Sequence, residues 1–157
     1  MFSNTFEYAV RAAVNLASVE GSSASAERIA ECTQVPPGYI SKVMRDLVVA
    51  GLVESQRGPN GGFRLARAAS KISMLDIMNA VAPMARIAGC PLGIAAHVNL
   101  CPLHRRLDDA IASVEKAFAA TSLAELIEQP VAGEKRCKAL TQKATVSAPR
   151  TAKARRK

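Results

Sequence analysis

The 157-residue sequence predicts a mainly α-helical fold with one small β-hairpin and a long helix near its C-terminal end. Three observations support this class. Apolar residues recur at helical spacing in three successive segments before residue 51. A glycine-rich connection then separates two short segments of alternating polarity, and a second helical stripe of apolar residues runs from residue 103 to 118. With 49% hydrophobic residues, the chain can build a folded core.

The first three helices are expected in quick succession. The first spans Thr5–Glu20, where Gly21 stops it. The second spans Ala26–Cys32, with Ser25 placed to cap its N-terminus. The third begins at Pro36-Pro37, since proline suits the first helical turn, and a glycine ends it at position 51.

A β-hairpin is expected directly after the third helix. Its strands lie within residues 52–56 and 63–67, and the connection between them contains three glycines and a proline. Alternation within the second strand places Phe63 and Leu65 inward and Arg64 outward. Glycines at such a turn indicate a backbone that approaches something closely.

A fourth helix is expected near Ser73, stopped by Pro83, and residues 84–101 follow without a clear period. A long helix begins at Pro102, and a last short helix spans Leu123–Ile127 behind a Ser-x-x-Glu capping pattern. The long helix carries an apolar seam at Leu103, Leu107, Ile111, Val114 and Phe118. This seam favours a two-fold dimer. The same seam also fits packing of the long helix on the first helix. We expect both contacts, on opposite sides of the long helix.

The charge of the chain is concentrated at its C-terminal end. Residues 1–133 carry 12 Lys/Arg and 12 Asp/Glu, whereas residues 134–157 carry 9 Lys/Arg and one Glu, which accounts for the whole net charge of +8. The segment from about residue 130 has few large apolar side chains, so we expect a disordered basic tail. The absence of a membrane-length apolar run and of a signal-like N-terminus favours a cytoplasmic protein whose cysteines are thiols or metal ligands rather than disulfides.

Three helices followed by a hairpin predict a winged helix-turn-helix, in which the third helix enters the DNA major groove and the hairpin, the wing, lies along the neighbouring backbone. Between residues 42 and 71 the basic side chains outnumber the acidic Asp46 and Glu54. They are Lys42, Arg45, Arg57, Arg64, Arg67 and Lys71. The alternative is an ordinary solvated helix face beside a hairpin.

The stretch PPGYISKVMRDLVVAGLVESQRGPNGGFRLAR resembles the recognition helix and wing of the IscR/NsrR-type regulators, the Rrf-two family of winged-helix transcription factors. The resemblance runs from about Thr5 to Glu128, and its most specific part is the wing motif Arg-Gly-Pro-x-Gly-Gly-aromatic-x-Leu. It implies a bacterial homodimer, acting as a repressor, that binds an imperfect palindrome in double-stranded DNA.

The resemblance also implies which residues contact DNA. The start of the third helix reads bases and the wing arginine enters the minor groove; in this chain these are Gly38, Tyr39, Ser41, Lys42 and Arg57. Gly38 offers only its backbone. Tyr39 either contacts a base or packs its ring on the helix-turn-helix core with its hydroxyl at a phosphate. The expected DNA-binding set is Tyr39, Ser41, Lys42, Arg45, Arg57 and Arg64.

The segment before the long helix is the expected sensor. Family members that sense iron–sulfur status, nitric oxide or redox stress carry three cysteines here, whereas this chain has Cys90 and Cys101, with 10 residues between them, followed by His104. In NsrR-like relatives a carboxylate from the partner's first helix completes the cluster, and Glu7 lies at the matching place. The resemblance thus implies a 2Fe-2S cluster on Cys90, Cys101, His104 and Glu7. Two thiolates with mixed nitrogen and oxygen ligands make such a cluster labile, as a sensor requires.

Two further possibilities stay open for this segment: a redox-active thiol pair without a cluster, and a loop with no sensor function. His97 is a further possible ligand, Cys32 is expected to be structural and Cys137 incidental. The expected organisation is a winged helix-turn-helix domain over 1–83, a sensor loop over 84–101, a dimerisation helix and short terminal helix over 102–129, and a tail over 130–157.

Other classes fit the sequence less well. No nucleophile–histidine–acid set, phosphate-binding loop or HExxH motif is found, which argues against an enzyme. Aromatic residues make up only 4%, so a base-stacking RNA platform is not expected. A winged helix used as a protein-interaction module remains an alternative, and it would lack salt-sensitive duplex binding.

Overall fold

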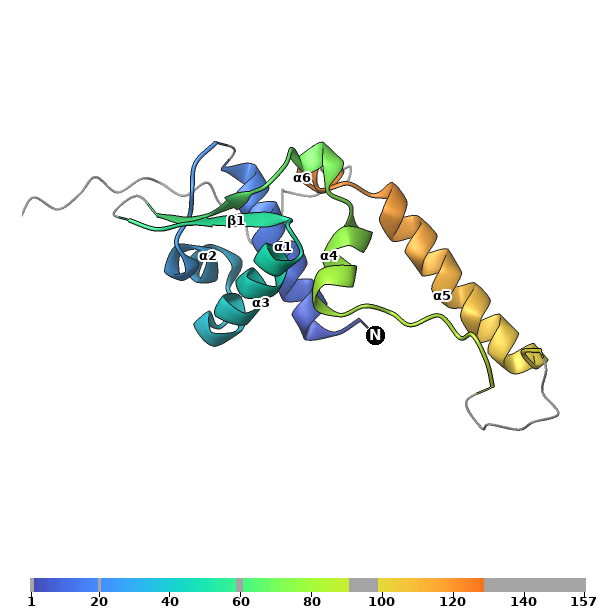
Figure 1. The fold of residues 1–157 in the computed structure, drawn as a ribbon. Helices are drawn as coiled ribbons and strands as arrows, with labels where there is room; N and C mark the ends of the chain where they lie inside the picture. The colour runs from blue at the N-terminus through green and yellow to red at the C-terminus, as the bar shows by residue number, and fades with distance from the viewer. Residues whose placement is uncertain (1, 20, 59–60, 91–98, 129–157) are drawn as a thin grey trace, which may run out of the picture.

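The computed structural model describes residues 2–19, 21–58, 61–90 and 99–128, and it confirms the mainly helical class with a two-stranded hairpin (Figure 1). The expectations about His97, Cys137 and the basic tail fall outside these residues. Along the chain the elements are α1 (Asn4–Ser18), α2 (Ala26–Thr33), α3 (Pro37–Val49), β1 (Val53–Gln56), β2 (Gly62–Leu65), the short 3-10 helix η1 (Ala69–Lys71), α4 (Met74–Val81), α5 (Pro102–Ala120) and α6 (Leu123–Glu128).

The helix starts follow the capping side chains. Ser25 accepts a hydrogen bond from the Arg28 N–H (3.3 Å) at the start of α2, as predicted. Ser3 does the same for α1, whose start lies one residue earlier than expected. This helix ends at Ser18 rather than residue 20, because the Val19 N–H turns to the Leu16 carbonyl (3.3 Å) in a tighter closing turn.

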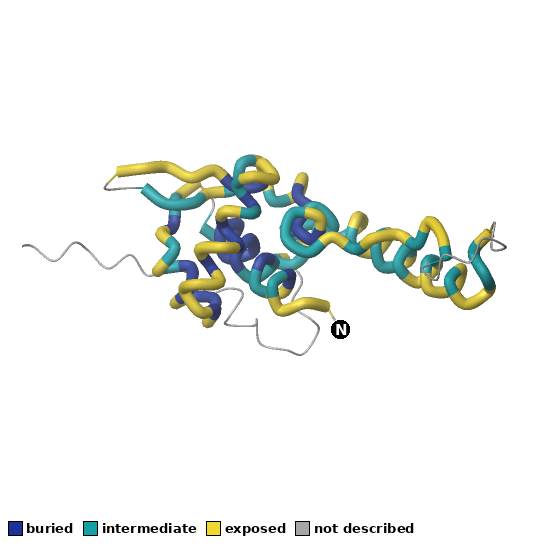
Figure 2. Tube along the Cα trace, turned by 60° about the horizontal axis from the view of Figure 1, so that its bottom comes forward, coloured by how far each residue is buried: buried dark blue, intermediate teal, exposed yellow. Residues whose placement is uncertain are grey.

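The core is built around α1, which packs against α2, α3, α4 and α6. Its small residues, Ala9, Ala12 and Ala13, are almost fully buried and let the neighbouring helices approach closely. The larger fully buried side chains include Val14, Ile29, Ile40, Val43, Met44, Leu47, Ile72, Ile77, Met78 and Leu123. Figure 2 shows buried residues concentrated in this body, whereas α5 carries only intermediate and exposed ones.

The hairpin has the predicted inward and outward sides. Glu54 pairs with Arg64 across the two antiparallel strands, and Val53 pairs with Leu65. Phe63 and Leu65 pack on the core, while Arg64 is exposed. The first strand begins one residue later than expected, because the Leu52 N–H donates to the last turn of α3.

The fourth helix begins as predicted. Ser73 accepts from the Asp76 N–H (3.1 Å) and the Asp76 carboxylate accepts from the Ser73 N–H (2.9 Å), a complete capping box. The helix ends at Val81, ahead of the expected stop at Pro83. No helix in the described ranges is long and apolar enough to cross a membrane.

The long helix α5 projects from the body, and α6 returns to it (Figure 1). Leu123 is fully buried, and its N–H donates to the Ile72 carbonyl (2.9 Å). At the C-terminal end of α5, Phe118 stacks on Phe6 of α1 with ring centroids 5.4 Å apart.

The apolar seam of α5 is divided along its length. Phe118 contacts the chain's own α1, whereas Leu103 is 64% and Leu107 is 48% exposed. One stripe thus packs on α1 at its C-terminal end and is exposed at its N-terminal end. The reason is that α5 begins away from the body and approaches it along the chain, so only its last turns reach α1 (Figure 1). The use of the opposite side of the helix for a dimer stays a prediction.

Candidate DNA-binding surface and sensor segment

The recognition helix α3 has one buried and one exposed face. Ile40, Val43 and Leu47 are fully buried against the body. Between them, Ser41 and Lys42 are exposed. The first turn is exposed as well, including Gly38 and Tyr39. The Ser41 hydroxyl donates to the Pro37 carbonyl (3.3 Å), a weak local bond that a base edge can replace.

The position of Tyr39 is compatible with both roles considered for it. Its ring is 50% exposed, and its centroid lies 5.5 Å from that of Tyr8 in α1, with the rings edge to face. The contact fixes one side of the ring on the body and leaves the rest accessible to DNA. The second turn of α1 thus contacts the first turn of α3.

The six basic side chains of the helix and wing fall into two groups. Arg64 donates two hydrogen bonds to Glu54 (2.7 and 2.9 Å), Arg67 lies 3.7 Å from Asp76, and Arg45 lies 3.5 Å from Asp46. In the described part of the chain, no ion pair is formed by the remaining three, which are Lys42, Arg57 and Lys71.

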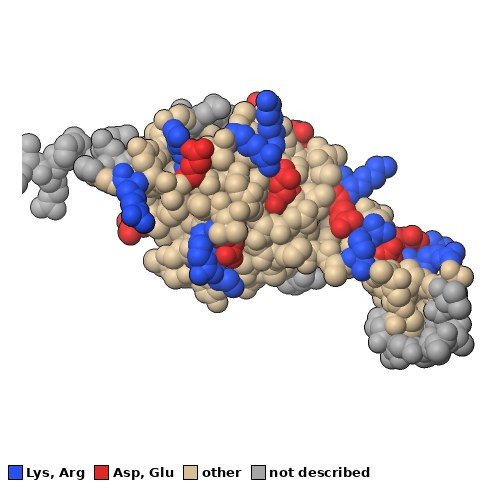
Figure 3. Space-filling model, viewed as in Figure 1, with Lys and Arg blue, Asp and Glu red and all other residues tan. Residues whose placement is uncertain are grey.

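The pairing decides which charges are available to a phosphate. Arg64 shares its charge with a carboxylate that DNA would have to displace, whereas Lys42 and Arg57 do not. On the face shown in Figure 3, basic and acidic side chains alternate without forming one large basic patch. On this face, positive charge is therefore carried by separate side chains interspersed with acidic ones.

The glycines of the wing are explained mainly by the protein's own backbone. A Cβ on Gly62 would lie 2.6 Å from the Ala24 carbonyl oxygen, since Ala24 exchanges two backbone hydrogen bonds with Phe63 (2.8 and 3.0 Å). A Cβ on Gly61 would lie 2.5 Å from the Gln56 oxygen. Only Gly58, with φ +113° and open space around it, is required by backbone conformation alone. It follows Arg57 directly and orients the exposed end of the wing.

Two of the four expected cluster ligands lie together. The Cys101 Sγ lies 3.3 Å from the His104 Nδ1 at the N-terminal end of α5, where Cys101 is the N-cap residue. A thiol and an imidazole at this spacing are suitable donors for iron. Cys90 is half-buried at the other side of the segment.

The full set is not assembled within one chain. Among the residues that the structure describes, no group of three or more His, Cys, Asp or Glu side chains is placed to hold a metal. Glu7 forms an ion pair with Arg11 one turn along α1. Thiolate, imidazole and carboxylate are donor types that fit an iron–sulfur cluster.

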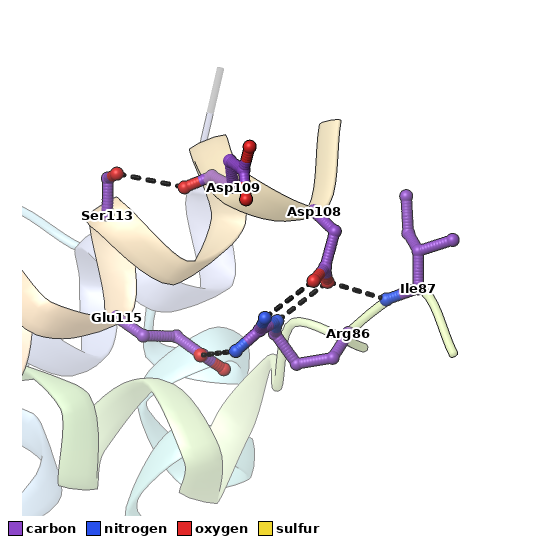
Figure 4. Close-up of polar contacts among 6 residues, drawn as sticks. All are labelled: Arg86, Ile87, Asp108, Asp109, Ser113 and Glu115. Atoms are coloured by element: carbon purple, nitrogen blue, oxygen red, sulfur yellow. Dashed lines mark hydrogen bonds and ion pairs between the residues drawn. The ribbon is translucent and has the colours of Figure 1, made fainter. Parts of the chain in front are cut away.

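The segment that leads to Cys90 is attached to α5 by a charge clamp, which we define as Arg86 with Asp108 and Glu115 (Figure 4). The Arg86 guanidinium donates to both oxygens of Asp108 (2.7 and 2.5 Å) and to Glu115 (3.4 Å). The Ile87 N–H donates to Asp108 as well (2.9 Å). The Arg86 and Ile87 hydrogen bonds lower the pKa of Asp108 to about 2, and the contacts with Asp108 and Glu115 raise the pKa of Arg86.

Comparison with known proteins shows which family has this architecture. The family described as "Iron-dependent Transcriptional regulator", Rrf2, matches residues 2–129, nearly all of the chain before its basic tail. The chain belongs to the Rrf2 family. It is therefore a DNA-binding transcriptional regulator rather than an enzyme, and the resemblance inferred from the wing motif is confirmed.

Individual Rrf2 relatives agree with this. A protein of Aquifex aeolicus (strain VF5) that is named as an HTH-type transcriptional regulator is 30% identical over 133 residues, 81% of this chain and 91% of its own. Among solved structures, IscR of T. potens has a TM-score of 0.69 at 25% identity, over 82% of this chain and 86% of that one. The oxidized form of Staphylococcus aureus CymR has a TM-score of 0.65 at 26% identity, over 83% and 98%.

Sequence reasoning missed two features of this Rrf2 regulator. Arg86 and Asp108 are 22 residues apart and belong to no shared pattern, so nothing local indicates their pairing. Tyr8 and Tyr39 are the only two tyrosines of the chain, yet they lie in separate helices. The sequence signal for the clamp is that the aperiodic segment carries a basic residue and α5 carries acidic ones.

Proposed function

We propose that this Rrf2 regulator is a homodimeric repressor that reads a palindromic operator with α3 and the wing. The observation that carries the proposal is the joint exposure of Ser41 and Lys42 on α3 and of Arg57 at the wing, on a helix whose opposite face is fully buried. A helix held in this way can enter the major groove without rearranging the core, while Arg57 reaches the neighbouring minor groove.

The dimer is supported by the exposed end of the α5 seam. Leu103 and Leu107 lie one turn apart, and α5 contains no buried residue. A second copy packing on this stripe would remove both side chains from water. Two-fold pairing would then place two α3 helices about 34–36 Å apart, the length of one DNA turn.

Oligomeric state and duplex binding test this proposal together. Leu107→Asp places a charge on the stripe and should give a monomer in sedimentation, with weaker operator binding. Ser113→Asp is the matched control, because it adds the same charge to an exposed position of α5 outside the stripe. If both variants remain dimeric, the exposed stripe of α5 is not the dimer interface. Duplex binding that does not weaken with added salt would favour a protein-interaction module instead.

For the sensor we propose a 2Fe-2S cluster held by Cys90, Cys101 and His104, with Glu7 supplied by the partner subunit. The Cys101–His104 pair supports it, and so does the ligand type of all four residues. When bound, the cluster would supply reactivity toward oxidants and nitric oxide. The chain's own residues determine how the segment is oriented against α5. Protein purified without oxygen should be coloured and contain iron and sulfide. Cys101→Ala should remove the colour and leave a folded dimer.

A thiol-pair sensor without iron is the second candidate. Cys90 and Cys101 are the two free thiols that flank the segment, and both are half-buried rather than inaccessible. If the anaerobic protein is colourless but mild thiol oxidants change its operator affinity, this candidate replaces the cluster. If it is colourless and indifferent to oxidants, the segment carries no sensor.

A further inference from the structure

The clamp joins the aperiodic segment to one side of α5. Asp108 and Glu115 are seven residues apart, which is two helical turns, so their side chains lie on the same side of the helix. A single guanidinium contacts both, and the following N–H contacts Asp108. An arginine fork on a carboxylate fixes direction as well as position. In Figure 1 the segment runs beside α5 toward the N-terminal end of that helix.

Chain lengths then determine how far along α5 the segment reaches. From Ile87 to Cys90 there are three residue steps, which in an extended chain cover about 10 Å. From Asp108 back to Cys101 there are seven helical steps, which cover about 10.5 Å along the axis. Because Ile87 is fixed at Asp108 and the two paths run in the same direction, Cys90 can reach at most the level of Cys101 on the helix, and the bend at Gly89 shortens this reach.

We infer that Arg86 is a positioning residue that keeps Cys90 within reach of the Cys101–His104 pair at the N-terminal end of α5. The inference rests on the proposed sensor function of these three residues, but its geometry does not involve iron or DNA. Without the clamp, the segment after α4 would lose its ion pairs with α5, and Cys90 would move over a larger volume. The clamp raises the effective concentration of Cys90 at Cys101.

Thiol cross-linking tests this directly. In a Cys32→Ala, Cys137→Ser background only Cys90 and Cys101 remain as thiols. Dibromobimane joins two thiols with loss of two bromide ions and becomes fluorescent when both are bound. We expect intramolecular cross-linking in this protein to be about ten-fold faster than in its Arg86→Ala variant, as expected when a tether is released.

Two further variants control the experiment. Arg106→Ala removes the same charge from α5 at a position whose only described ion pair is the distant contact with Asp109 (4.0 Å), so it should cross-link at the original rate. Asp108→Asn disrupts the clamp from its other side and should match Arg86→Ala. Far-ultraviolet circular dichroism and operator binding report whether each variant is folded.

The outcomes separate this inference from the proposed function. A cross-linking rate in Arg86→Ala and Asp108→Asn that equals or exceeds the original would overturn the positioning role, whatever metal the protein binds. A slower rate in a protein that never binds iron would support the positioning role and reject the cluster.

Discussion

The ring of Tyr8, in α1, lies edge to face against the ring of Tyr39, in the first turn of α3, with 5.5 Å between the centroids. Tyr8 directly follows Glu7, the carboxylate proposed to complete the sensor. One aromatic contact therefore joins the helix segment that carries Glu7 to the first turn of α3, the proposed recognition helix. A displacement of the first turns of α1 would change how Tyr39 is presented to DNA.

Removing the Tyr8 ring should weaken operator binding without unfolding the protein. An aromatic pair contributes about 0.5–1.5 kcal/mol, so we expect Tyr8→Ala to bind the operator about 2- to 12-fold more weakly. Tyr8→Phe keeps the ring and should bind as the original protein does. Fluorescence anisotropy with operator and unrelated duplexes measures both. An equal loss for the two duplexes would show that Tyr8 acts on general stability and not on the placement of Tyr39.

Arg57 and Arg64, the two arginines of the wing, should contribute differently to operator binding. Arg57 has no described ion-pair partner, so Arg57→Ala should lose about 1–3 kcal/mol of operator binding if it reads the minor groove. Arg64 is engaged by Glu54 at 2.7 Å, and its replacement by alanine should cost less. Lys42→Ala should resemble Arg57→Ala. If neither Arg57→Ala nor Lys42→Ala changes the affinity of a folded protein, the helix-and-wing docking is wrong.

The wing should not tolerate a side chain at Gly62. The alanine Cβ would meet the Ala24 carbonyl at 2.6 Å, at a φ of +149°. Backbone strain of this kind costs about 1–3 kcal/mol, so Gly62→Ala should lower the thermal unfolding midpoint. Gly38→Ala is the control: nothing lies within 4 Å of the new Cβ, and alanine in a helix is favoured by about 0.5–1 kcal/mol. A Gly62→Ala protein as stable as the original would contradict the close approach of Ala24.

The clamp gives a defined pH dependence. The pKa of Asp108 is lowered from 3.8 to about 2 by its Arg86 and Ile87 hydrogen bonds. A carboxylate with a lowered folded-state pKa contributes stability above its unfolded pKa and loses that contribution as the pH falls through the folded value. The stability difference between the original protein and Asp108→Asn should thus be constant above about pH 5 and vanish toward pH 2. A difference that grows on acidification would exclude this role for Asp108.

The basic tail should contribute affinity without sequence preference. Deleting residues 134–157 removes the whole net charge of +8. Because lysines and arginines in such a segment contact phosphates, the truncated protein should bind unrelated DNA more weakly and show a smaller salt dependence. Discrimination between operator and unrelated duplex should survive. Its loss would mean that the tail reads sequence.

Much of the body could be predicted because its signals are local. Ser25 and the Ser73–Asp76 capping box begin their helices as expected, and the alternation of Phe63, Arg64 and Leu65 gives the correct sides of the hairpin. Helix capping and strand alternation depend on neighbours within a few residues. The elements and the winged-helix class follow from such patterns.

The features that sequence reasoning missed depend on contacts between distant residues. The Arg86–Asp108 clamp and the Tyr8–Tyr39 contact each join elements that share no period. The stacking of Phe118 on Phe6 could not be separated from a dimer seam, because both use the same apolar stripe of α5. Only the direction in which α5 approaches the body decides which part of the stripe is covered.

The central claim is that two copies of α3 and the wing read a two-fold symmetric duplex. Selection of bound duplexes from a random pool by the full-length protein tests this most directly. The account predicts one enriched motif with two inverted half-sites whose centres lie about 10–10.5 base pairs apart, lost when the selection is repeated with Arg57→Ala and Lys42→Ala combined. Enrichment of no motif, or of a motif without inverted symmetry, would contradict it.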